Sequence, residues 1–93
     1  MDLPVNYEEL TWQERREVRE EYIRVQKDLC AYCGANLYWS AAASVRSKEI
    51  DWDLFPENFL KYPIHLHHDH DTGMTIGAVH NYCNAVLWQY EGK

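Results

Sequence analysis

Two short pairs of metal-binding side chains constrain the fold of this chain more than any other feature. One pair is Cys30-x-x-Cys33, and the other is His80-x-x-Cys83. Each spacing lets a single turn of backbone direct two ligands at one ion, and three cysteines with one histidine suit tetrahedral zinc. Four protein ligands leave no coordination position for a substrate. We therefore predict a structural zinc ion that joins a zinc knuckle at residues 30–34 to the start of the last helix.

The short length of the chain makes such an ion important. With 93 residues, we expect one domain that spans residues 1–93. A chain of this size buries only roughly 60 to 65% of its unfolded surface, so its core needs additional support. Structural zinc binds with about 10 to 16 kcal/mol of apparent free energy in small peptides. A redox role for Cys30 and Cys33 is the competing interpretation, but a redox motif normally begins a helix after a strand, whereas this one follows a predicted helix.

The charge of the chain argues against tight, non-specific nucleic-acid binding. The net charge is −6, with five basic and eight acidic side chains in residues 1–28 and four and seven in residues 29–93. This balance provides no basic footprint, so a polyanion would need a local basic patch or a bound cation. There is also no membrane-length apolar segment and no signal-peptide pattern, so we expect a soluble, cytoplasmic protein without a membrane partner.

A helix is predicted from about residue 12 to about residue 28, because no glycine or proline interrupts this run. Thr11 and Glu14 have the spacing of a capping box, in which each side chain satisfies a free backbone amide. Residues 1–10 are expected to be a loosely held lead. The apolar face predicted for the helix consists of Val18, Tyr22, Val25 and Leu29.

Charged side chains occupy the other faces of this predicted helix. We expect most of them to be solvated and to form i,i+4 ion pairs such as Glu20–Arg24. The alternative is that Arg15, Arg16 and Arg19 contact a phosphate backbone.

The remaining residues predict an α+β fold. Residues 35–54 are irregular; residues 37–39 could form a short strand, and residues 40–47 a short helix or an inserted loop. Pro56 favours a brief helix that ends near Tyr62. A hairpin with strands at residues 64–68 and 74–79 is then predicted, followed by a helix from His80 to about Tyr90. The expected core is therefore a ββα unit at about residues 64–90.

The stretch from His65 to Asn84 concentrates metal-binding side chains and carries a family resemblance. It reads HLHHDHDTGMTIGAVHNYCN, with four histidines in residues 65–70. The order His67-His68-Asp69-His70, Thr72-Gly73, Gly77 and Cys83-Asn84, combined with the knuckle, resembles the HNH (ββα-metal) endonucleases. Within that family it looks most like the branch of phage recombination endonuclease VII. The resemblance covers about residues 29–88.

The resemblance implies a divalent-cation-dependent DNA endonuclease of modest sequence specificity. The fold it implies is a small zinc-stapled ββα-metal domain with an N-terminal helix. By position, His68 matches the general base that activates water, and Asn84 matches the residue whose side-chain oxygen binds the catalytic cation. His67 occupies the position of the family's metal-binding aspartate, and His70 could support it or be a third ligand. The partner would be DNA, cleaved to 5′-phosphate and 3′-hydroxyl ends.

The resemblance also suggests a phage or prophage origin, with a second copy of the chain or phage packaging proteins as further partners. The imidazole of His67 in place of a carboxylate should favour Mn²⁺, Co²⁺ or Ni²⁺ more than an all-oxygen site would, although Mg²⁺ could still bind.

Strand geometry limits how the adjacent histidines can cooperate. Neighbouring residues on a regular strand face opposite sides, so His67 and His68 can share a site only where the strand ends or bulges. On a regular strand, His68 and His70 would face one side and His70 could replace His67 as the ligand, although His67 is the favoured ligand. His65 is expected to be an ordinary strand residue.

Two other classes of protein fit parts of the pattern. A non-catalytic zinc module that binds nucleic acid or protein would keep the four zinc ligands, but it would have no use for His67, His68 and Asn84 at a second site. A redox protein would need Cys30 and Cys33 to be free of metal.

Overall fold

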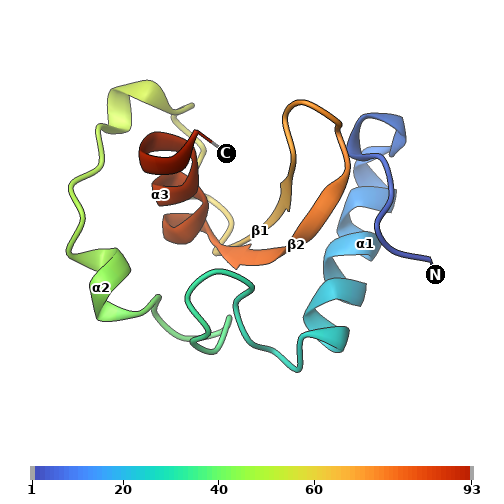
Figure 1. Cartoon of the computed structure of the whole chain (residues 1–93), viewed down its shortest axis with the longest axis horizontal. Helices are drawn as coiled ribbons and strands as arrows, with labels where there is room; N and C mark the ends of the chain where they lie inside the picture. Colours follow the sequence, from blue (N-terminus) through green and yellow to red (C-terminus); the bar gives the residue numbers. More distant parts are fainter. Residues whose placement is uncertain (1, 93) are drawn as a thin grey trace.

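The computed structural model describes residues 2–92 and shows a small α+β fold. Figure 1 shows a two-stranded hairpin between helix α1 on one side and helix α3 on the other. The elements in chain order are the 3-10 helix η1 (Tyr7–Glu9), α1 (Trp12–Val25), α2 (Ala43–Arg46), the 3-10 helix η2 (Trp52–Leu54), β1 (Ile64–His68), β2 (Thr75–His80) and α3 (Asn81–Glu91).

Helix α1 begins with the predicted capping box and ends earlier than expected. The Thr11 side chain accepts from the Glu14 amide, and the Glu14 carboxylate accepts from the Thr11 amide. The helix ends at Val25 because Lys27 and Asp28 adopt left-handed backbone with φ of 57° and 65°. Val25, at the end of the helix, and Leu29, beyond it, were predicted to be in the core but are exposed. Ile23 is buried instead.

The details of the apolar face and the ion pairs follow from this shorter helix. Val18 and Tyr22 are buried as predicted, whereas Val25 and Leu29 are about half exposed, at 50% and 47%. The expected Glu20–Arg24 pair is not formed, because Glu20 pairs with Arg16 at 3.5 Å and Arg24 pairs with Glu21.

The hairpin contains the irregularity that two adjacent functional histidines would need. β1 and β2 are antiparallel, and the register shifts between His67, which lies opposite Gly77, and His68, which lies opposite Thr75. Ile76 is the extra residue of this bulge. The turn is closed by Asp69, whose carboxylate accepts from two backbone amides at 2.8 and 3.0 Å, and by Gly73 at φ +79°.

The N-terminal residues are held, contrary to the expectation of a loose lead. The Val5 amide donates to Thr75 Oγ1 at 3.0 Å, and the Thr75 amide donates to the Val5 carbonyl at 2.8 Å. The Tyr7 amide donates to the Gly73 carbonyl at 2.7 Å. An exposed strand edge presents unpaired backbone groups, and this segment covers the outer edge of β2.

The middle of the chain is mostly turns. Residues 37–39 form a turn rather than a strand, while α2 lies within the segment expected to be a short helix or a loop. The helix predicted from Pro56 to Tyr62 is wrong, since this segment forms successive turns. The Asn81 side-chain amide donates to the Tyr62 carbonyl at 3.1 Å, so this carbonyl has a hydrogen-bond partner although it lies outside any helix.

The core lies where β2 meets α3 and α1. Its fully buried side chains include Leu37, Val79, Cys83 and Val86. Gly77 allows α1 and the knuckle to approach β2, because a Cβ there would lie 2.8 Å from the Gln26 side-chain oxygen and 2.9 Å from the Ala31 Cβ. Within residues 2–92, no helix is both long and apolar enough to cross a membrane.

Candidate functional site

The two predicted zinc-binding pairs meet at one point. The ligand atoms of Cys30, Cys33, His80 and Cys83 all lie within 4.8 Å of one another. His80 Nδ1 is 3.5 Å from Cys33 Sγ and 3.5 Å from Cys83 Sγ. With Zn–S bonds of about 2.3 Å and Zn–N bonds of about 2.0 Å, tetrahedral ligands of these two kinds lie about 3.5 Å apart. The donor set therefore fits zinc, and this Cys₃His cluster could hold a structural zinc ion.

The backbone around the cluster orients its ligands. The amides of Tyr32 and Cys33 donate to Cys30 Sγ at 3.4 and 3.5 Å, and Gly34 turns the chain with φ +79°. His80 Nε2 donates to the Asn36 carbonyl at 2.9 Å, which leaves Nδ1 as the ligand. Hydrogen bonds of this kind fix the tautomer and the ring orientation of metal-binding histidines.

The electrostatics of the cluster favour a thiolate at Cys30. A hydrogen bond from the Cys83 thiol is the largest cause, and together with backbone amides it outweighs burial and lowers the pKa of Cys30 to about 4. The same interaction raises the pKa of Cys83 above its usual range. Three sulfur atoms at this separation cannot all carry charge unless a cation neutralises them, so a bound zinc would release the remaining protons.

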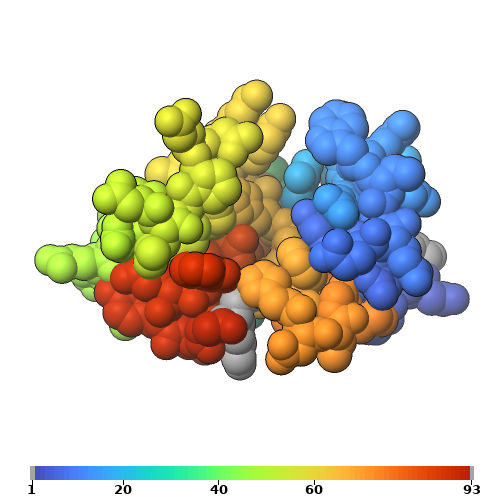
Figure 2. Space-filling model, turned by 90° about the horizontal axis from the view of Figure 1, so that it is seen from above, coloured from blue at the N-terminus to red at the C-terminus, as the bar shows by residue number. Residues whose placement is uncertain are grey.

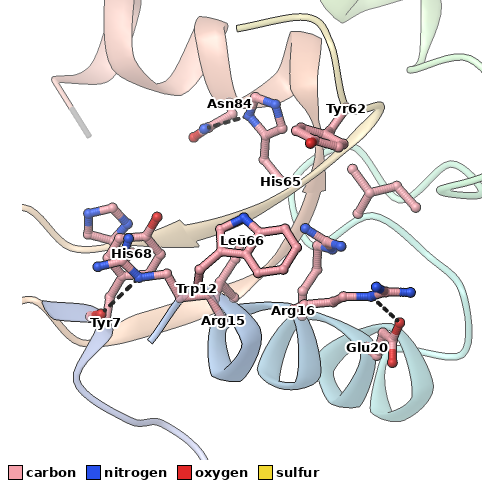
Figure 3. A pocket seen from close by; sticks show the side chains of 12 residues that line it. Tyr7, Trp12, Arg15, Arg16, Glu20, Tyr62, His65, Leu66, His68 and Asn84 are labelled. Atoms are coloured by element: carbon pink, nitrogen blue, oxygen red, sulfur yellow. Dashed lines mark hydrogen bonds and ion pairs between the residues drawn. The ribbon is translucent and has the colours of Figure 1, made fainter. Parts of the chain in front are cut away.

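A second region of chemical interest is an open groove of about 710 Å³. In Figure 2, α1 and the segment before β1 rise on either side of this hollow. Figure 3 shows its side chains projecting from α1, from β1 and from the first turn of α3. The residues that line it include Tyr7, Trp12, Arg15, Arg16, Arg19, Tyr62, His65, His68 and Asn84.

His68 lines this groove and is held through the face of its ring. It stacks on Tyr7 with ring centroids 3.9 Å apart and planes 4° from parallel. The Arg15 guanidinium carbon lies 3.9 Å from the Tyr7 centroid, on the opposite face, since His68 occupies the first. Burial, and then the neighbouring His70, lower the pKa of His68 below 6.5. The ring is therefore neutral at neutral pH, which is the form that can accept a proton.

Asn84 and His65 meet on the same groove. Asn84 Nδ2 lies 3.1 Å from His65 Nδ1, and the Asn84 Oδ1 points away from this contact (Figure 3). The rings of His65 and Phe59 pack edge to face with centroids 4.7 Å apart. Burial lowers the pKa of His65, so this imidazole is also neutral at neutral pH. The sequence offered no signal for this contact.

The other predicted site residues differ in whether they line the groove. His67 is buried, at 5% exposure, opposite Gly77, and it does not line the groove. His70 is exposed, with its ring centroid 5.0 Å from that of His68. Three predicted nucleic-acid contacts all line the groove, namely Arg15, Arg16 and Arg19. The fold thus brings His68, Asn84 and the arginines to one surface, with His65 rather than His67 beside Asn84.

We compared the chain with family models, with curated proteins and with solved structures, and none of them matches it.

Proposed function

We propose that this protein is a divalent-cation-dependent endonuclease of the HNH (ββα-metal) type that hydrolyses phosphodiester bonds of DNA in the groove. The observation that carries the proposal is the gathering of an imidazole, a side-chain amide and three guanidinium groups on one open surface. That surface is formed by α1, by the hairpin and by the helix that follows the hairpin, and the Cys₃His cluster lies where the hairpin enters that helix.

His68 is the proposed general base. Hydrolysis needs a group that takes a proton from the attacking water, and a positioned histidine contributes about 10²- to 10⁴-fold. The stack on Tyr7 restrains the ring by its face and leaves its nitrogen atoms available. The lowered pKa keeps the ring ready to accept a proton at neutral pH.

Asn84 and His65 are the pair best placed to hold the catalytic cation. Two ligands about 2.1 Å from an octahedral cation, in neighbouring positions, lie about 3.0 Å apart. The atoms of Asn84 and His65 are 3.1 Å apart, and a half-turn of the amide would present Oδ1 in place of Nδ2. A bound divalent cation supplies positive charge that stabilises the phosphate and the leaving oxygen. His67, the ligand implied by position, could contribute only if its buried ring turned toward the groove.

The arginines supply the local basic patch that the acidic chain otherwise lacks. Arg15, Arg16 and Arg19 all come from α1 and line the groove. Guanidinium groups bind phosphate oxygens in a bidentate manner, so they would hold the DNA backbone beside His68. This concentrates positive charge where a net charge of −6 would otherwise repel a polyanion.

The test is nicking of supercoiled plasmid with Mg²⁺ or Mn²⁺, with a chelator control. Wild type should cleave, and His68→Ala should lose about 10²-fold or more of the rate while zinc content and circular dichroism stay unchanged. His70→Ala is the comparison variant, because it removes an imidazole that helps to lower the pKa of His68 but leaves the stack on Tyr7, so its loss of rate should be much smaller.

Two results would contradict the proposal. Cleavage by folded His68→Ala at the wild-type rate would remove His68 as the base. No cleavage by the wild type with any divalent cation, together with retained DNA binding, would favour the non-catalytic zinc module.

A further inference from the structure

Two exposed aromatic side chains face the same groove. Trp12 is the first residue of α1 and is 73% exposed, and Tyr62 is 50% exposed. Both line the groove from different segments of the chain (Figure 3). Among residues 2–92, no aromatic ring packs on the Trp12 indole. An indole left open to water in a groove is a surface on which another flat ring can stack.

Guanidinium groups continue from Trp12 along one face of α1. Arg16 and Arg19 follow Trp12 at i+4 and i+7, spacings that place all three side chains on one side of a helix. Arg16 pairs with Glu20 at 3.5 Å, but these side chains are 62% and 61% exposed. Such an exposed pair contributes only about 0 to 1 kcal/mol, so a phosphate could displace the carboxylate.

We infer that the groove binds an unpaired DNA strand, with a base stacked on Trp12 and phosphates on Arg16 and Arg19. This inference rests on the proposed function and names its substrate class as DNA that contains a single-stranded segment, such as a gap, a flap or a frayed end. Alternating aromatic and basic side chains are the means by which proteins bind single strands without sequence preference. In a duplex the bases are stacked on one another, so no base face is available to the indole.

The size of the groove agrees with this substrate. Its volume of about 710 Å³ lies within the roughly 300 to 1,000 Å³ of pockets that bind small ligands. A space of that size accommodates one or two nucleotides of a strand.

The experiment is fluorescence anisotropy with a short fluorescein-labelled oligothymidylate, with the full zinc-loaded chain in buffer without Mg²⁺ or Mn²⁺. The wild type should bind this single strand more tightly than a duplex of the same length. Trp12→Ala should weaken binding about tenfold, which corresponds to about 1.4 kcal/mol. Trp12→Phe, which keeps a flat ring, should recover most of the affinity.

The chain offers a matched control in Trp39, which is 76% exposed but lies outside the groove. Trp39→Ala should bind as the wild type does. Equal affinity of Trp12→Ala and wild type, or equal affinity for duplex and single strand, would overturn the inference. Tighter binding of an oligouridylate would assign the groove to RNA and overturn it as well.

The outcome separates this inference from the proposed function. Loss of single-strand binding in Trp12→Ala in a protein that never cleaves plasmid would support the binding site and reject the nuclease. Cleavage of plasmid that is insensitive to Trp12→Ala, with unchanged anisotropy, would support the nuclease and reject the binding site.

Discussion

The Cys₃His cluster and the groove use the same kinds of side chain in opposite ways. In the cluster, four ligand atoms lie within 4.8 Å, three of the four residues are buried, and backbone groups hold both Cys30 and His80. In the groove, His68 is restrained through the face of its ring, and Asn84 keeps an oxygen directed away from its partner. Closure suits an ion that stabilises a fold, whereas openness suits groups that must meet a substrate.

The two regions are nevertheless linked through α3. His80 and Cys83 lie three residues apart on one face of the helix start, and Asn84 follows directly on another face. A zinc ion in the cluster would therefore fix the direction in which Asn84 projects. The closed cluster would in this way help to position the open groove.

The largest expected effect concerns the closed cluster. Cys83→Ser should lose zinc and unfold the chain, because Cys83 is fully buried and structural zinc contributes about 10 to 16 kcal/mol, as much as a small domain's entire stability. Zinc content and far-ultraviolet circular dichroism measure the outcome, with His70→Ala as the folded control. A cooperative thermal transition in zinc-free Cys83→Ser would show that the core does not depend on the ion.

A second prediction distinguishes the ligands of the groove. Asn84→Ala and His65→Ala should each raise the Mn²⁺ concentration for half-maximal plasmid cleavage by about tenfold or more. His67→Ala should instead lower stability by about 2 to 5 kcal/mol, because it removes a buried ring. If His67→Ala raised the Mn²⁺ concentration for half-maximal cleavage and His65→Ala did not, His67 rather than His65 would be the cation ligand.

A smaller effect is expected from the ring that supports His68. An aromatic stack contributes about 0.5 to 1.5 kcal/mol, so Tyr7→Ala should lower kcat by roughly two- to tenfold. Tyr7→Phe retains the ring and should have nearly the wild-type kcat. The measurement is the rate of plasmid nicking at saturating DNA, so that a change in KM is separated from a change in kcat. Equal rates for Tyr7→Ala and wild type would mean that the stack does not position His68.

The smallest effect concerns pH. Burial holds the pKa of His65 below its ordinary value of 6.5, so between the two values the unfolded chain binds more protons than the folded one. The free energy of unfolding is therefore complete above about pH 6.5 and decreases as the pH falls through the folded pKa. Urea denaturation on either side of pH 6.5 should show a shallower decrease for His65→Gln than for wild type. A steeper decrease in the variant would contradict the sign of this shift.

Several features of the molecule could be predicted because they depend on local spacing. The capping box at Thr11 and Glu14, the hairpin at residues 64–80 and the convergence of the two Cys/His pairs each follow from contacts between residues close in sequence or from the demands of one ion. Where the prediction failed, long-range contacts decided the outcome. Asn81 donates to the Tyr62 carbonyl at the end of the segment that forms turns, and Val5 and Tyr7 make backbone bonds to Thr75 and Gly73 at the open edge of β2.

The residues whose side chains can bind zinc, accept a proton or contact phosphate are evident from the sequence alone. Which of them share a surface follows from the fold. His67 and His68 face opposite ways despite the register shift between them, one toward the interior and the other toward the groove, and the packing of α3 on β1 brings Asn84 to His65. The physical reason is that the direction of a side chain depends on strand register and helix placement, which arise from contacts between residues far apart in the chain.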